Sequence, residues 1–198
     1  MNILVCGGAG FIGSAFILNY FKNNPDSKIT NLDVLTIGSN LENLKSIENN
    51  SNYKFIQDNI RNESVVDTLV KDTDVIINFA AESHVDRSIA NPKPFLDTNI
   101  LGTYSILEAT RKYDKQFIHV STDEIYGDAH GKSSFDENSQ INPSNPYAAT
   151  KAAADHLVSS YHRTYGINCI TTRCTNNFGP NQFPEKLIPK TIIRSIKN

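Results

Sequence analysis

Five side chains in the second half of the sequence have the types and spacing that proton transfer requires. Thr122, Asp123 and Glu124 are consecutive, and Tyr147 and Lys151 stand four residues apart. Residues four apart on a helix share one face, so the lysine would favour the phenolate and lower the pKa of the tyrosine towards that of a general base. Two adjacent carboxylates at the mouth of a cleft repel each other, so one can hold a proton while the other stays charged. The set therefore offers a base and an acid to one small molecule.

Each pattern also has a purely structural explanation. About 0.5 Tyr–Lys pairs at this spacing are expected by chance in a chain of this composition, so the pair alone is nearly uninformative. The Thr-Asp-Glu triplet is common at a helix N-terminus, where the hydroxyl caps the backbone and the acids face water. The pattern gains weight only if the fold brings these residues to a cofactor.

The first thirteen residues predict such a cofactor site. A short apolar run leads directly into Gly7, Gly8, Gly10 and Gly13, which satisfy both G-x-G-x-x-G and G-x-x-G-x-x-G. Glycines there permit a tight turn, let the backbone approach a pyrophosphate and let the next helix lie close to the strand, with its N-terminal amides facing the phosphates. A Gly-rich turn that binds nothing is the alternative.

Asp33 extends this prediction to the identity of the dinucleotide. It ends a second apolar stretch at residues 29–32 and lies twenty residues past Gly13. A carboxylate at that point accepts hydrogen bonds from a ribose 2′-hydroxyl and repels a 2′-phosphate. The sequence therefore favours NAD over NADP.

The elements that must position these residues follow from the hydrophobic pattern. Apolar runs alternate with helical patterns, which predicts an α/β fold, a Rossmann-type doubly wound parallel sheet with helices on both faces. Ligands of such sheets bind beyond the carboxyl ends of the strands, so the candidate residues should share one rim. After the first strand, strands are predicted at residues 29–32, 53–57, 74–79, 116–120 and 167–173, and helices at residues 11–24, 95–113 and 147–165 and around Val65, Val66, Leu69 and Val70.

Two details of the first half are predicted as well. Ser39 is expected to cap a short helix after the second strand. The first helix is expected to bury the stripe formed by Ile12, Ala15, Phe16 and Tyr20.

Length and composition limit the class of protein. The chain has 198 residues, 39% of them hydrophobic, and a formal net charge of −2. Its basic residues are scattered, so neither nucleic acid nor an anionic membrane surface is an expected partner. Cys6, Cys169 and Cys174 lie in apolar runs without C-x-x-C spacing, which favours buried reduced thiols. No apolar run approaches eighteen residues and the chain enters a strand at once, so a cytoplasmic protein is expected.

Long strings in the sequence resemble the extended short-chain dehydrogenase/reductase family, and within it the nucleotide-sugar 4,6-dehydratases. The resemblance covers nearly the whole chain. The matching strings are FAAESHVDRSI at residues 79–89, VSTDEIYG at 120–127, PYAATKAAAD at 146–155, RCTNNFGP at 173–180 and PEKLIP at 184–189.

This resemblance implies a reaction and a role for each candidate catalytic residue. Tyr147, with Thr122 and Lys151, would take the proton of the sugar's C4 hydroxyl while hydride passes to NAD. Glu124 would then remove the C5 proton, Asp123 would protonate the departing C6 hydroxyl, and the hydride would return to C6. The implied substrate is a nucleoside-diphosphate glucose, with dTDP-glucose as the expected donor.

The resemblance also implies the residues that hold each ligand. Asn59 departs from the family, which usually has an Asp there against the adenine, although an amide oxygen can accept the same bond and Asp58 is the alternative. Thr98, or alternatively Asn99, would contact the nicotinamide half. The implied cofactor contacts are Gly7, Gly10, Phe11, Ile12, Gly13, Asp33, Asn59, Ile60, Ala80, Ala81, Ser83, Thr98, Tyr147, Lys151 and Asn177; the implied substrate contacts are His84, Thr122, Asn176, Lys186 and Leu187. His84 and Asp86 have no third ligand at a plausible spacing, so no metal site is expected.

The family continues beyond the position that matches residue 198. The resemblance therefore implies a dinucleotide-binding domain with the catalytic residues at 1–182, the start of a substrate-binding region at 183–198, and a substrate domain that is largely missing. It also implies a homodimer formed through the helices at 95–113 and 147–165. The open alternatives are a related NAD-dependent epimerase or decarboxylase of another nucleotide sugar, and a non-catalytic NAD-binding module.

Overall fold

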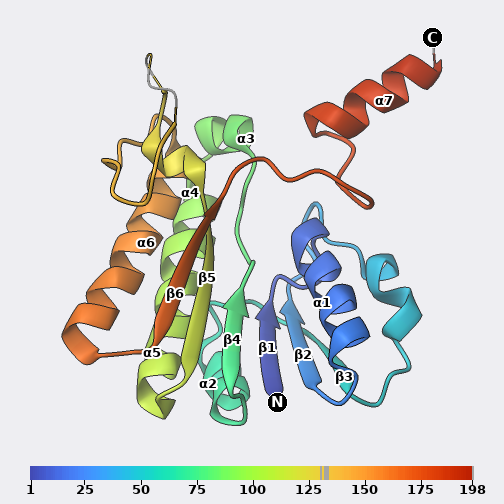
Figure 1. Ribbon diagram of the computed structural model, residues 1–198, viewed down its shortest axis with the longest axis vertical. Coiled ribbons are helices and arrows are strands. Elements are labelled where there is room, and N and C mark those ends of the chain that lie inside the picture. Colours follow the sequence, from blue (N-terminus) through green and yellow to red (C-terminus); the bar gives the residue numbers. More distant parts are fainter. Residues whose placement is uncertain (130, 132–133, 198) are drawn as a thin grey trace.

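The apolar runs form one sheet of six parallel strands in a computed structural model of the chain, which describes residues 1–129, 131 and 134–197. The strand order is β3-β2-β1-β4-β5-β6, and every neighbouring pair is parallel (Figure 1). The predicted doubly wound sheet is therefore confirmed. The strands are β1 (Asn2–Cys6), β2 (Lys28–Asp33), β3 (Tyr53–Gln57), β4 (Val75–Asn78), β5 (Gln116–Thr122) and β6 (Cys169–Cys174).

Helices connect the strands and cover both faces of the sheet. α6 shows how local sequence sets their limits: the Asn145 side chain accepts a hydrogen bond from Ala148 N, Pro146 takes the first helical position, and Gly166 ends the helix with a left-handed backbone. The helices are α1 (Phe11–Asn23), α2 (Glu63–Lys71), α3 (Val85–Ala90), α4 (Lys93–Phe95), α5 (Thr103–Tyr113), α6 (Pro146–Tyr165) and α7 (Leu187–Lys197), with 3-10 turns η1 (Leu41–Ile47) and η3 (Asp123–Tyr126) and a π-helical segment η2 (Leu96–Gly102).

The predicted helix at residues 95–113 contains the π-helical segment. α4, η2 and α5 follow one another without a break. Asn99 of η2 is buried, and its amide binds both the N–H and the carbonyl of Glu82 and the hydroxyl of Thr150. Segments of this kind are frequent at functional sites. Here it carries the residue that ties the loop after β4 to α6.

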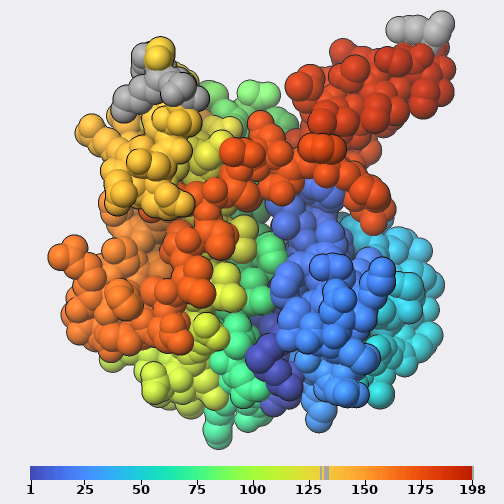
Figure 2. All heavy atoms as spheres, in the orientation of Figure 1, coloured from blue at the N-terminus to red at the C-terminus, as the bar shows by residue number. Residues whose placement is uncertain are grey.

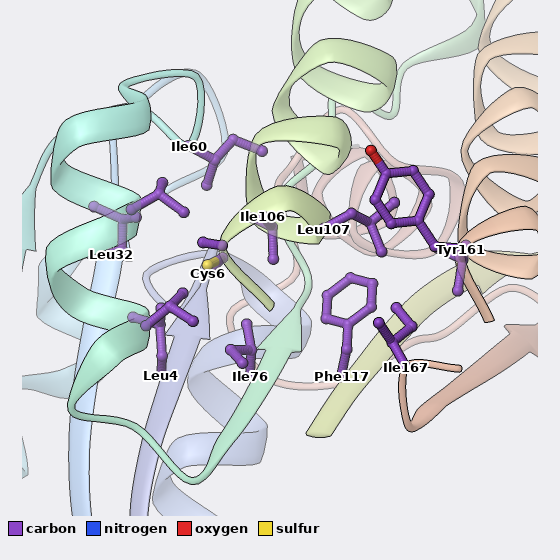
Figure 3. Packing of buried hydrophobic residues seen from close by; sticks show 14 residues of the cluster. Leu4, Cys6, Leu32, Ile60, Ile76, Ile106, Leu107, Phe117, Tyr161 and Ile167 are labelled. Carbon is purple, nitrogen blue, oxygen red and sulfur yellow. The ribbon is translucent and has the colours of Figure 1, made fainter. Parts of the chain in front are cut away.

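Two hydrophobic clusters, one on each face, hold the layers together. On one face, Leu4, Ile76 and Phe117 of three neighbouring strands point towards Ile106 and Leu107 of α5 (Figure 3). Each of these side chains is fully buried. Because burying such a side chain stabilises a fold by about 1.5–3 kcal/mol, this cluster fixes the sheet against its helices and so fixes the rim above it.

Two predictions about the first half of the chain need correction. α1 buries Gly13, Ser14, Ile17 and Phe21. Of the predicted stripe, Phe16 and Tyr20 are half-buried and pack against the core, whereas Ile12 and Ala15 are exposed, so the inner face is centred one residue further along the helix. The reason is Gly13: a Cβ there would lie 2.3 Å from Gly7 O, so the helix must turn this glycine towards the strand. η1 is capped by Asn40, whose side chain accepts from Glu42 N, and not by Ser39.

The prediction for the cysteines holds only in part. All three are free, but only Cys6 is buried, whereas Cys169 and Cys174 are half-buried.

The last described helix stands apart from the sheet. β6 leads into residues 175–186, which cross above the carboxyl ends of the strands, and α7 then projects from the body (Figure 2). None of the residues of α7 is buried. The predicted substrate region at 183–198 therefore stays a prediction, and its last residue lies outside the described part. Among the described residues, no helix has the length and apolar character needed to cross a membrane.

Candidate cofactor and active site

A cavity of about 500 Å³ lies at the carboxyl ends of the strands. β1 and β4 are neighbours in the sheet, and the segments that follow them leave towards α1 and α3. The strand order reverses at this point, which is where doubly wound sheets bind dinucleotides. The cavity is lined from the turn after β1, the ends of β2 and β5, the loop after β4, the first turns of α6, and residues 174–186.

The glycines of the first turn differ in what requires them. Gly7 has φ +78°, and a Cβ on it would lie 2.6 Å from Ala80 N. Gly13 cannot carry a side chain, because its Cβ would lie 2.3 Å from Gly7 O. Gly10 has an ordinary φ of −72°, and a Cβ on it would meet only Gly7 O, at 3.4 Å. The fold thus demands Gly7 and Gly13, whereas Gly10 leaves a shallow cradle beside the cavity at the N-terminus of α1. That cradle fits the close approach of a pyrophosphate.

Two alanine substitutions separate these roles. Gly7→Ala is expected to lower the free energy of unfolding by about 1–3 kcal/mol, since it forces a side chain into a left-handed conformation against the Ala80 backbone. Gly10→Ala should change that free energy by no more than about 0.5 kcal/mol, yet weaken NAD binding about tenfold or more, because its methyl group fills the cradle. Urea unfolding and calorimetric titration measure both. Unchanged NAD affinity in Gly10→Ala would contradict the assignment.

Asp33 is buried at the end of β2 and is fixed in place by the turn. Its Oδ2 accepts from Ala9 N and its Oδ1 from Leu35 N, both at 2.9 Å. Each carboxylate oxygen has a further lone pair available. The geometry therefore leaves Asp33 able to accept hydrogen bonds from a ribose in the cavity that it lines.

Asn59 and Asp58 both line the cavity, so the alternative between them stays open. The amide oxygen of Asn59 accepts from Arg61 N at 2.9 Å, and Asp58 Oδ1 accepts from Asn59 N at 2.7 Å. Thr98 also lines the cavity, whereas the buried amide of Asn99 holds the Glu82 backbone.

The Thr-Asp-Glu triplet forms the 3-10 turn η3 at the end of β5. Thr122 Oγ1 accepts from Glu124 N at 3.3 Å, so the structural explanation as an N-cap applies to the hydroxyl. The Glu124 side chain nonetheless lines the cavity, and Asn145 Nδ2 donates to its Oε2 at 3.4 Å. Asp123 is half-buried and is not among the lining residues. The structure thus brings Thr122 and Glu124 to the cavity together.

Tyr147 and Lys151 line the same cavity from α6, but their pKa values differ from the prediction. Burial raises the pKa of the Tyr147 phenol to about 12; the Thr122 hydroxyl opposes this, and the charges of Glu124 and Asp123 add to it. Burial also lowers the pKa of Lys151 to about 8, and its Nζ donates to Val120 O at 2.8 Å. The prediction that Lys151 lowers the pKa of Tyr147 is wrong in this structure, because burial dominates and the lysine is bound to the strand.

The structure brings most of the other predicted contacts to the cavity. Leu187 is the exception: it begins α7, is 80% exposed and does not line the cavity. The predicted residues that line the cavity are Gly7, Gly10, Phe11, Ile12, Gly13, Asp33, Asn59, Ile60, Ala80, Ala81, Ser83, His84, Thr98, Thr122, Glu124, Tyr147, Lys151, Asn176, Asn177 and Lys186.

An ion pair that the sequence did not suggest fixes the crossing segment. Arg87 Nη2 donates to Glu185 Oε2 at 2.5 Å, and His84 Nε2 lies 3.6 Å from the same oxygen. Ser88, in the same string, accepts from Tyr147 N at 3.1 Å and so ties α3 to the start of α6. The opposite charges of residues 87 and 185 were the only available signal. The two residues are 98 positions apart in the sequence, which is too far for an argument from spacing.

Comparisons with known proteins agree with this geometry. Residues 4–198 match the family model described as GDP-mannose 4,6 dehydratase. The Low-salt glycan biosynthesis protein Agl12 of Haloferax volcanii is 50% identical over 197 residues, which cover 98% of this chain and 63% of that protein. A dTDP-glucose 4,6-dehydratase of Escherichia coli is 46% identical over 217 residues, covering 99% of this chain and 60% of the relative.

Solved structures show the same similarity in three dimensions. The dTDP-glucose 4,6-dehydratase of Bacillus anthracis in complex with NAD superimposes with a TM-score of 0.92 at 42% identity, over 100% of this chain and 62% of that one. UDP-glucuronic acid 4-epimerase of Bacillus cereus, in complex with UDP-glucuronic acid and NAD, gives 0.93 at 30% identity, over 100% and 63%. The chain thus spans roughly 60% of the length of these relatives.

Proposed function

The chain belongs to the GDP-mannose 4,6-dehydratase family of NAD-dependent nucleotide-sugar dehydratases and epimerases, and on that premise we propose that it dehydrates a nucleoside-diphosphate glucose to the 4-keto-6-deoxy sugar. The proposed donor is dTDP-glucose. The observation that carries the proposal is the meeting of Thr122, Glu124, Tyr147 and Lys151 in the cavity that begins at the Gly-rich turn.

Residues of the first half hold the cofactor in this proposal. The cradle at Gly10 and the amides at the start of α1 bind the pyrophosphate, and Asp33 accepts hydrogen bonds from the ribose of NAD. NAD, when bound, supplies the acceptor and then the donor of one hydride, so that it is recycled in each turnover.

Residues of the second half move the protons. Tyr147, beside the Thr122 hydroxyl, accepts the proton of the C4 hydroxyl as C4 is oxidised. The new ketone makes the C5 proton acidic, and Glu124 removes it. Asp123 protonates the C6 hydroxyl, which leaves as water; the hydride taken from C4 then returns to C6, and the proton held by Glu124 returns to C5. No atom is lost except those of the water.

Product analysis tests the proposal. The chain is incubated with NAD and dTDP-glucose, and the sugar product is identified by mass and NMR spectra. A 4-keto-6-deoxy sugar supports dehydration, whereas a sugar inverted at C4 or shortened by one carbon refutes it. In deuterated water the product should also carry deuterium at C5, because Glu124 exchanges that proton with solvent.

Two observations favour an epimerase as the second candidate function. Asp123 does not line the cavity, and an epimerase superimposes as well as a dehydratase does. An epimerase needs no acid for C6, so an inverted product would favour that activity. Binding of NAD with no conversion of several sugar nucleotides would favour an NAD-binding module.

Assembly and location are part of the proposal. We propose a homodimer through α5 and α6, where Leu101, Tyr104 and Tyr165 are exposed large side chains on or beside these helices. A cytoplasmic location is proposed from the reduced cysteines and the nucleotide substrate.

A further inference from the structure

A cluster of buried charged side chains lies behind the catalytic face of α6. Lys151 and Asp155 stand one helical turn apart on α6 and are only 3% and 4% exposed. His119 of β5 is fully buried, and the side chain of Arg173 of β6 is 22% exposed. Charged side chains are rarely buried unless they are paired, because burial without a partner is costly; we therefore examine which of these groups are paired.

Asp155 is the single anion among these four groups. Its Oδ2 accepts from Arg173 Nε at 2.9 Å. Its Oδ1 has no hydrogen-bond partner among the described residues and lies 3.5 Å from His119 Nε2. Burial, with the charge of Lys151 as a second cause, holds the pKa of His119 well below its usual value, so the imidazole is neutral. Asp155 therefore pairs with Arg173 and lies one helical turn from the second cation, Lys151, on which its charge also acts.

We propose that Asp155 is a positioning residue that keeps Lys151 positively charged in its buried site beside Tyr147. Its relevance to catalysis rests on the proposed function, but the charge relation between the two side chains does not.

Arg173 and Lys151 differ in how readily they lose a proton. An arginine guanidinium does not lose its proton in proteins. If the cluster loses its carboxylate, Lys151 is therefore the cation that gives up a proton. Burial already lowers the pKa of Lys151 to about 8, and the charge of Asp155 opposes that change. Without the carboxylate, the ammonium would be buried in a cluster whose remaining charge is the cation Arg173, and it would lose its proton near neutral pH.

The other groups that face Lys151 do not replace Asp155. β5 contributes the Val120 carbonyl, which accepts from Nζ at 2.8 Å, and the neutral His119. β6 contributes the Cys174 thiol, a weaker influence than Asp155, and α6 contributes Tyr147 one turn before the lysine. Asp155 is thus the carboxylate among the groups that act on Lys151 in the described part of the chain.

Besides pairing with Asp155, Arg173 holds the turn η3 in place. Its Nη1 donates to Tyr126 OH at 2.8 Å, and Tyr126 ends η3, the turn that carries Glu124. The Asp155–Arg173 pair therefore also joins α6 to that turn. If Asp155 served only this pair, its loss would loosen the structure around Lys151.

The two accounts predict opposite changes of the lysine's ionisation. Loss of the carboxylate charge alone lowers the pKa of Lys151, whereas loosening admits water and raises it towards the ordinary value for lysine. The experiment follows the Cε resonance of Lys151 with pH in the whole chain labelled with 13C-lysine, assigned by its absence in Lys151→Arg. It needs neither NAD nor turnover, so it remains informative if the proposed reaction is wrong.

Three variants make the test complete. Asp155→Asn should lower the titration midpoint of Lys151 by about one pH unit or more. Because breaking a buried pair can unfold a protein, Arg173→Gln and the double variant Asp155→Asn/Arg173→Gln give the same comparison without an unpaired guanidinium. The double variant should titrate below Arg173→Gln. A midpoint that is unchanged or raised on loss of Asp155, in either background, would overturn the proposal; the other lysine resonances are the internal control.

Discussion

Glu124→Gln is expected to stop the proposed reaction after oxidation at C4. Gln is nearly isosteric with Glu and its carbonyl can still accept from Asn145, so the turn η3 should keep its form. An amide cannot remove the C5 proton, so formation of the 4-keto-6-deoxy sugar should fall by about 10²–10⁴-fold. The 4-keto sugar that still has its C6 hydroxyl should accumulate on the protein, and deuterium from the solvent should no longer enter C5.

The control for this variant is Glu42→Gln, since Glu42 is an exposed acid in η1 that does not line the cavity. It should react as the unchanged chain does. Full turnover in Glu124→Gln, with deuterium still entering C5, would show that another group is the base and would refute the role of Glu124.

Tyr147→Phe is expected to block the oxidation at C4, and not the later removal of the C5 proton. The variant keeps the ring, which packs edge-on against Phe95 with 6.3 Å between centroids, and keeps the backbone bond to Ser88. It loses only the hydroxyl, so the free energy of unfolding and NAD affinity should change little. Turnover should fall by about 10²–10⁴-fold because no side chain then takes the C4 proton.

The raised pKa of Tyr147 gives this prediction a pH signature. With a pKa of about 12 the phenol holds its proton near neutral pH, so the base form grows as the pH rises. The unchanged chain should gain activity with pH on the acid side of its profile, and what activity remains in Tyr147→Phe should lack that slope. Accumulated 4-keto sugar in Tyr147→Phe would contradict the assignment.

Local signals allowed parts of the structure to be predicted closely. The helix that carries Tyr147 lies between Asn145-Pro146 and Gly166, and each of these residues acts through its own backbone preference. β3 was predicted without error at residues 53–57 because its apolar run ends in polar residues on both sides. The Gly-rich turn was found because its requirements, a left-handed Gly7 and space at Gly13, depend on a few consecutive residues.

Predictions failed where a side chain depends on a distant part of the chain. The rotation of α1 is set by the carbonyl of Gly7 against Gly13, which a hydrophobic stripe cannot reveal. Leu187 matches a family string, yet it is 80% exposed and does not line the cavity, because α7 leaves the body of the protein. Helical spacing alone predicted a lowered pKa for Tyr147, but burial by the surrounding elements outweighs one neighbouring charge and raises that pKa.

Periodicity and turn chemistry act over a few neighbouring residues, so the α/β sheet, the Gly-rich turn with Asp33 and the residue types for proton transfer could be recognised from local sequence. The fold was needed to find that Glu124 and not Asp123 lines the cavity, that Lys151 is bound to Val120 O, and that Asp155 joins Arg173. These features depend on which side chains become buried together, and burial sets both the available partners and the energy of each charge. That energy arises only when β5, β6 and α6 exclude water from the space between them.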